Sequence, residues 1–275
     1  MADEWRRKWA RAGLARSLAV ANLAIVAALL VAGAAQAAAK DGATWTLDVY
    51  DSRAVVWQDP DGSACTSAAV QTMLNLVAYE SPAEYMAPPD ARASRTAPQW
   101  RADTSHGMTE TLLGYERANM TMLAASAGTD PHGWRNALNY YGWGSINAGV
   151  YRDSAYATFD AAARAVVTSL SRSHRPVGIL ARSGGHAQVV TGFVTAGRDP
   201  RVGDDFTILG VYVTDPLRLA ALRDTWVSLE DWRSGATTVR FAPYLQADSP
   251  YRDGIDGAVG TAEWYGKWVI VNAVR

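Results

Sequence analysis

The stretch QDPDGSACTSAAVQTML, residues 58–74, carries the only cysteine of a 275-residue chain at the point where a loop passes into a helix. Asp-Pro followed by Asp-Gly is typical of a turn. From Thr66 onward, apolar side chains recur at helical spacing and predict a helix of about 15 residues. Cys65 is therefore expected in the first turn of that helix, where free N–H groups and the helix dipole stabilise a thiolate.

A single cysteine fits two interpretations. Free cysteine is among the most buried residue types, which favours a structural side chain. The chain has no second cysteine, so Cys65 has no partner for an internal disulfide. Its place at a helix N-terminus favours a nucleophile instead. Residues far downstream have to decide between the two.

The composition describes a globular chain with a different segment at its front. Hydrophobic residues make up 49% and charged residues 19%, which leaves enough apolar material for a core. The net charge of −1, without a basic block in the body, gives no support for a nucleic-acid partner. The sequence lacks a phosphate-binding G-x-x-x-x-G-K-[ST] loop and Cys/His clusters at zinc-ligand spacing. Neither a cofactor nor a metal is expected.

Residues 1–39 have the pattern of a secretory signal peptide. Basic residues precede an uncharged apolar run that ends in an Ala-Gln-Ala triplet, and cleavage is expected near Ala37 or Ala39. An uncleaved membrane anchor is the alternative, because residues 18–39 are just long enough to span a bilayer. Membrane contact is expected only in that case. Residues 40–275 then form the exported domain, and the protein is expected to be secreted or held at the cell surface.

The order of the predicted elements indicates an α+β domain. Helices are expected after the quoted loop and at residues 108–120, 131–142 and 158–173. Strands are expected at residues 176–182, 184–196, 206–216, 237–244 and 266–275, with shorter extended segments at 44–50 and 146–151. Helices thus cluster in the N-terminal half and strands in the C-terminal half. This order predicts helices packed on a mainly antiparallel sheet rather than alternating β-α-β units.

Polar residues on two of the predicted strands are candidates to act with Cys65. His186 opens an apolar strand after two glycines, where its imidazole can reach a facing helix terminus. Asp215 ends the next strand and can orient the other ring nitrogen, as base-orienting groups do in catalytic triads. Gln58 is a candidate to hold an oxyanion together with the Cys65 backbone N–H. The remaining histidines are most simply solvated surface residues, namely His106, His132 and His174.

The segments VVWQDPDGSACTSAAVQTML, RPVGILARSGGHAQVVTGF and VYVTDP resemble the papain-like cysteine peptidases. The resemblance is closer to their double-glycine-peptidase-like (bacteriocin-leader-peptidase-like) branch, and it extends over nearly all of the exported domain. It implies a papain-like fold in which Cys65 is the nucleophile and His186 the general base. Asp215 is then the orienting residue, and Gln58 the oxyanion donor. The chain departs from the family where Thr66 follows the cysteine, since Gly-Pro is common there.

The residues and the resemblance together predict an exported thiol protease. Such a hydrolase acts on peptide or protein substrates through a Cys-His-Asp triad and an acyl-enzyme. One alternative is a catalytically inactive secreted binding module on the same scaffold, because a fold does not guarantee its chemistry. The other is an acyltransferase that uses the same three residues.

Overall fold

A computed structural model of the protein describes residues 43–56, 65–80, 129–217, 223–235, 239–245 and 263–274. The chain divides into two compact units, Met1–Thr44 and Trp45–Arg275. The expected signal segment, the helix expected at 108–120 and Gln58 lie outside the described residues. Within the described part, no helix is both long enough and apolar enough to cross a membrane.

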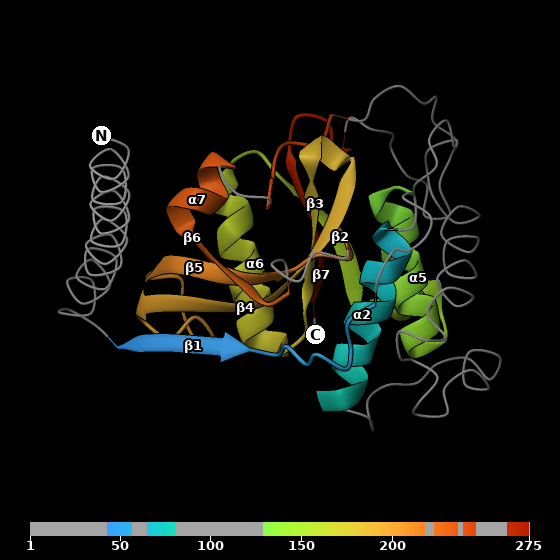
Figure 1. Ribbon diagram of the computed structural model, residues 1–275, viewed down its shortest axis with the longest axis horizontal. Coiled ribbons are helices and arrows are strands. Elements are labelled where there is room, and N and C mark those ends of the chain that lie inside the picture. Colours follow the sequence, from blue (N-terminus) through green and yellow to red (C-terminus); the bar gives the residue numbers. More distant parts are fainter. Residues whose placement is uncertain are drawn as a thin grey trace, which may run out of the picture. The chain divides into compact units, whose positions relative to one another are not determined.

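Figure 1 shows the helices and strands of the described chain, in which α2 and α5 follow one another and β3 to β6 come without an α-helix between them. The α-helices of this part are α2 (Cys65–Glu80), α5 (Pro131–Trp143), α6 (Phe159–Ser173) and α7 (Leu229–Ser234). The strands are β1 (Thr44–Asp48), β2 (Tyr151–Tyr156), β3 (Val177–Ala181), β4 (His186–Gly197), β5 (Phe206–Thr214), β6 (Thr225–Ser228) and β7 (Trp268–Ala273). Short 3-10 helices, η1 (Ile146–Ala148) and η2 (Arg182–Gly184), precede β2 and β4.

The strands form one sheet in the order β2-β7-β3-β4-β5-β6. The remaining strand, β1, pairs with β4 outside this linear order. Each neighbouring pair in that order runs antiparallel. The Val49 N–H donates to the Thr191 carbonyl at 2.9 Å and ties the end of β1 to β4. The prediction of an α+β chain with a mainly antiparallel sheet is confirmed, although β1 comes from the N-terminal half.

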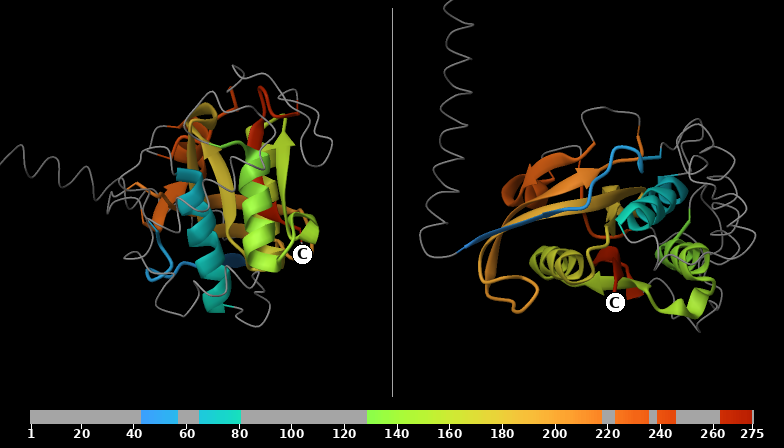
Figure 2. Two further views of the ribbon diagram at one scale, coloured as in Figure 1. Left: turned by 90° about the vertical axis from the view of Figure 1, so that its right-hand side faces the viewer. Right: turned by 90° about the horizontal axis from the view of Figure 1, so that it is seen from below.

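Helices cover both faces of the sheet. Helices α2 and α5 lie side by side (Figure 2) and share a buried cluster with Val269 and Val271 of β7. Ile270 lies between these two valines and points to the opposite face, where it packs in a second cluster with residues of α6 and α7. Because side chains alternate along a strand, one apolar run such as β7 supplies both cores.

Helix α2 is buried on all sides along most of its length. Polar side chains on it bond to the segment that follows β1. The Thr72 hydroxyl accepts a hydrogen bond from the Val56 N–H at 3.0 Å, and the Asn75 amide donates to the Ala54 carbonyl at 3.0 Å. Since an unpaired buried polar group is costly, these bonds fix the rotation of α2 about its axis. They thereby fix where Cys65, its first residue, points.

The prediction of an extended segment at residues 146–151 is largely wrong. Its first residues form η1, and β2 begins only at Tyr151. Gly149 ends the 3-10 turn in the left-handed region with φ 64°, a conformation that glycine adopts without strain. Strand β6 was not expected at all, because its four residues are too few to show an alternating pattern.

The strand expected at residues 237–244 is also wrong for the part that the structure describes. There, Phe241 and Tyr244 form isolated bridges, to Ala181 and Tyr265, instead of a continuous ladder. Pro243 lies between them and has no N–H to donate, so it interrupts strand pairing.

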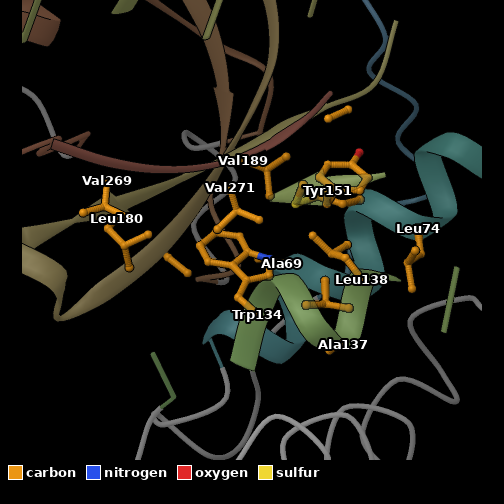
Figure 3. Packing of buried hydrophobic residues seen from close by; sticks show 14 of the residues in the cluster. Ala69, Leu74, Trp134, Ala137, Leu138, Tyr151, Leu180, Val189, Val269 and Val271 are labelled. Carbon is orange, nitrogen blue, oxygen red and sulfur yellow. The ribbon is translucent and has the colours of Figure 1, made fainter. Parts of the chain in front are cut away.

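Strand β3 meets α5 at Gly178. A Cβ atom on Gly178 would lie 2.4 Å from Cζ2 of Trp134, whose side chain is fully buried. Figure 3 shows Trp134 pointing from α5 toward the sheet residues Leu180 and Val271. The absence of a side chain at Gly178 therefore lets the indole lie directly against the strand, and this contact sets how closely α5 approaches the sheet.

We expect Gly178→Ala to lower the free energy of unfolding by about 1–3 kcal/mol, because the new methyl group overpacks a rigid indole in the core. Urea unfolding measures the change. In a Trp134→Phe background the smaller ring leaves room, so the same substitution costs less and the two changes couple in a double-mutant cycle. An unchanged unfolding free energy for Gly178→Ala would show that this contact is looser than described.

Candidate active site

Cys65 is the first residue of α2, and only 9% of it is exposed. The first N–H groups of a helix have no carbonyl partners within the helix, and the helix dipole is positive at that end. Both features favour a negative charge on a side chain in this position. The structure therefore places Cys65 at the helix terminus that the sequence predicts, in a buried setting.

His186 and Asp215 meet because of the register between β4 and β5. His186 is the first residue of β4, and Asp215 directly follows Thr214, the last residue of β5. Val189 pairs with Thr214 in the antiparallel ladder, so one further step brings Gln188 opposite Asp215. Residues two apart on a strand share a face, and His186 is therefore on the same face as both.

Asp215 is almost completely buried, and both of its carboxylate oxygens accept hydrogen bonds. Nε2 of His186 lies 2.9 Å from Oδ1 and 3.0 Å from Oδ2. Nε2 of Gln188 donates to Oδ2 at 2.5 Å, and the Leu217 backbone N–H donates to Oδ1 at 2.7 Å. Each oxygen thus holds one further donor beside the imidazole.

The electrostatics of the site favour a charged imidazole. Burial alone would lower the pKa of His186, but hydrogen bonds with Asp215 and Cys65 and attraction to their negative charges raise it to about 9. Burial also acts to raise the pKa of Asp215, but the hydrogen bonds from His186, Gln188 and Leu217 hold it below its ordinary value. Since Nε2 of His186 faces Asp215, Nδ1 is the ring nitrogen left to face the sulfur. The arrangement at neutral pH is an imidazolium between a carboxylate and the Cys65 side chain.

Of the residues expected at the site, the structure brings Cys65, His186 and Asp215 together, and Gln58 lies outside the described residues. Sequence reasoning missed Gln188. The signal was present, because Gln188 lies two residues after His186 and so shares its face of the strand. A role for its amide can be recognised only when the β4–β5 register is known, because that register places Asp215 opposite.

A second charged cluster surrounds the first turn of α5. Nε2 of His132 lies 3.2 Å from Oδ2 of Asp153 and 3.8 Å from Oε2 of Glu263. Nη1 of Arg135 lies 3.1 Å from Oδ1 of Asp153, and Nε1 of Trp264 donates to Oδ2 at 3.0 Å. The expectation that His132 is a solvated surface residue is wrong, because only 4% of it is exposed. Its place at the start of a polar helix concealed the packing against Trp264.

Ligand atoms of His132, Asp153 and Glu263 lie within 4.8 Å of one another, close enough to surround a metal ion. In the described part of the chain, however, Arg135 already lies against one of these carboxylates. Burial acts to lower the pKa of His132, but its hydrogen bond to Asp153 and the charge of that carboxylate raise it. A divalent ion would add positive charge beside Arg135. We therefore interpret this cluster as an ion-pair network that joins α5 to β2 and to the segment before β7.

No family model, curated protein or solved structure matches this chain. The chemistry of the site is therefore inferred from its own residues and geometry.

We expect nuclear magnetic resonance titration to show His186 protonated through neutral pH, with a pKa of about 9. Asp215→Asn should lower this pKa, because the substitution removes the negative charge that favours the imidazolium. Glu230→Gln removes an exposed carboxylate on α7 and should leave it unchanged. A wild-type His186 pKa near the ordinary value of about 6.5 would contradict the described electrostatics.

Proposed function

We propose that the protein is an exported thiol hydrolase, and more specifically a papain-like cysteine peptidase that cleaves peptide or protein substrates. The observation that carries the proposal is the meeting of Cys65, His186 and Asp215 from a helix terminus and two paired strands. A thiol in front of an imidazole and a buried carboxylate behind it is the arrangement that activates a nucleophile. A cysteine that only fills space in a core requires neither partner.

In the acylation step, the Cys65 thiolate attacks the carbonyl carbon of the scissile amide and forms a carbon–sulfur bond. The electron pair of the carbonyl moves to its oxygen and gives a tetrahedral oxyanion. His186 then donates its Nδ1 proton to the leaving nitrogen as the carbon–nitrogen bond breaks. The products of this step are a free amine, a thioester on Cys65 and a neutral imidazole.

In the deacylation step, His186 removes a proton from water as the water oxygen attacks the thioester. The carbon–sulfur bond breaks, the carboxylic acid leaves, and the thiolate and imidazolium are restored. Asp215 stays ionised throughout, holds the ring by Nε2 and stabilises the imidazolium. The reaction needs no metal and no organic cofactor.

The oxyanion is held by backbone and amide donors. The Cys65 N–H belongs to the first turn of α2, where it has no partner within the helix, and the helix dipole favours negative charge there. Gln58 supplies the second donor in this proposal, on the strength of its place before the nucleophile in the sequence.

The fold and the N-terminal segment are compatible with this activity. The α+β arrangement has the candidate nucleophile on a helix and the candidate base on an antiparallel sheet, as the papain-like resemblance implies. Residues 1–39 supply the expected route to secretion or to the cell surface.

The test is hydrolysis of a mixed peptide library by the full chain, read by mass spectrometry. We expect Cys65→Ala and His186→Ala each to lower kcat/KM by at least about a thousandfold, because either change removes the activated thiolate. Circular dichroism should show that both variants keep the wild-type fold. Glu230→Gln, an exposed change on α7, serves as the matched control and should keep full activity.

Full hydrolysis by Cys65→Ala would contradict the proposal. Transfer of the acyl group to an added amine in preference to water would instead identify an acyltransferase that uses the same residues. A wild-type protein that cleaves nothing, and whose thiol reacts no faster than free cysteine, would identify a binding module.

A further inference from the structure

Gln188 is a buried polar residue whose side chain contacts Asp215, one of the three site residues. It lies in the interior of β4 with 0% exposed, two residues after His186 and on the same face. Its Nε2 donates to Oδ2 of Asp215 at 2.5 Å. The proposed hydrolysis assigns no role to this amide.

Gln188 and the chain after β5 restrain the Asp215 carboxylate from both sides. The Leu217 N–H holds Oδ1 at 2.7 Å, and Gln188 holds Oδ2. Between them, Nε2 of His186 is nearly equidistant from the two oxygens, at 2.9 and 3.0 Å. Rotation of the carboxylate about its Cβ–Cγ bond would stretch the hydrogen bonds from Gln188 and Leu217. The plane of the carboxylate is therefore fixed, and Nε2 of His186 is held midway between the two oxygens.

A neutral donor is suited to this position. An amide N–H stabilises the ionised carboxylate in a buried place, where desolvation favours the protonated acid. It does so without adding positive charge, so the full attraction between Asp215 and the His186 imidazolium is kept. A lysine or arginine here would compete with His186 for the same carboxylate.

We propose that Gln188 is a positioning residue of the site, whose amide keeps Asp215 ionised and oriented so that Nδ1 of His186 faces Cys65. This inference rests on the proposed function, because it assumes that the Cys65–His186 pair is the reactive pair. In this role Gln188 acts on the Cys65–His186 pair through Asp215.

The experiment is the pH dependence of Cys65 alkylation by iodoacetamide in the full chain, which needs no known substrate. The wild type should react in mildly acidic solution, with a rate that declines along an acid limb. Gln188→Met keeps an unbranched side chain of similar size but removes the donor. We expect its acid limb to move upward by about one pH unit, which is about a tenfold slower reaction at a pH on the limb.

Gln188→Glu separates hydrogen bonding from packing. In a pair of buried carboxyl groups one ionises at low pH while the other keeps its proton. The protonated new carboxyl can then donate to Asp215 as the amide does, so the acid limb of Gln188→Glu should stay close to that of the wild type. The control is Thr195→Val, also fully buried on β4, whose hydroxyl has no hydrogen-bond partner in the described part of the chain. It should leave the profile unchanged.

The outcomes are distinguishable. If the wild type shows the acid limb and Gln188→Met reproduces it, the inference about Gln188 is overturned while the proposed function stands. If Gln188→Met fails to fold, the pH profile of Gln188→Glu is the deciding result. An acid limb of Gln188→Glu that lies about one pH unit above that of the wild type would overturn the role of Gln188 as a hydrogen-bond donor. If the wild-type thiol shows no reactivity in acid, the reactive pair is absent, and the proposed function and this inference are overturned together.

Discussion

The contact between the His186 imidazole and the buried Asp215 carboxylate is the interaction on which the account of this site depends. It joins two neighbouring strands at the end of the sheet, and its place is dictated by the β4–β5 register rather than by flexible side chains. A one-residue slip between these strands would turn Asp215 to the other face and leave a carboxylate buried without its partners. The same contact raises the pKa of His186 and fixes which ring nitrogen faces Cys65. The pairing of β4 with β5 therefore determines both the position of the His186–Asp215 contact and the raised pKa of His186.

The surrounding elements hold the N-terminus of α2, where Cys65 lies, next to the His186–Asp215 contact. Cores on both faces of the sheet make it a rigid central layer, and α2 lies buried between α5, β4 and the segment after β1. Trp134 against Gly178 sets the approach of α5, and the His132–Asp153 pair ties the first turn of α5 to β2. Bonds from Thr72 and Asn75 of α2 to residues 54–56 fix the rotation of that helix. Cys65 thus starts an element held on several sides, which suits a side chain that has to meet a partner within hydrogen-bond distance.

Much of this arrangement can be predicted from the sequence because its strongest signals are local. The helical spacing after Cys65, the Asp130-Pro131 start of α5 and the apolar runs of β3, β4, β5 and β7 are each visible within a few residues. The features that the sequence did not predict are either too short to show a pattern or depend on residues distant in the chain. Strand β6 is too short to show a pattern, and Pro243 reduces an expected strand to isolated bridges. The buried His132 packs edge to face against Trp264, which is distant in the chain. Gln188 is similar, since an amide on an apolar strand shows its use only when the register brings Asp215 opposite.

The most direct test of the central claim is the far-ultraviolet absorbance of the Cys65 thiolate, recorded as the difference between the wild type and Cys65→Ser across a pH titration. If His186 and Asp215 hold an imidazolium beside the sulfur, the thiolate absorbance should persist to a lower pH in the wild type than in His186→Ala. If both proteins lose the absorbance at the same pH, the sulfur is not paired with the imidazolium and the account is wrong.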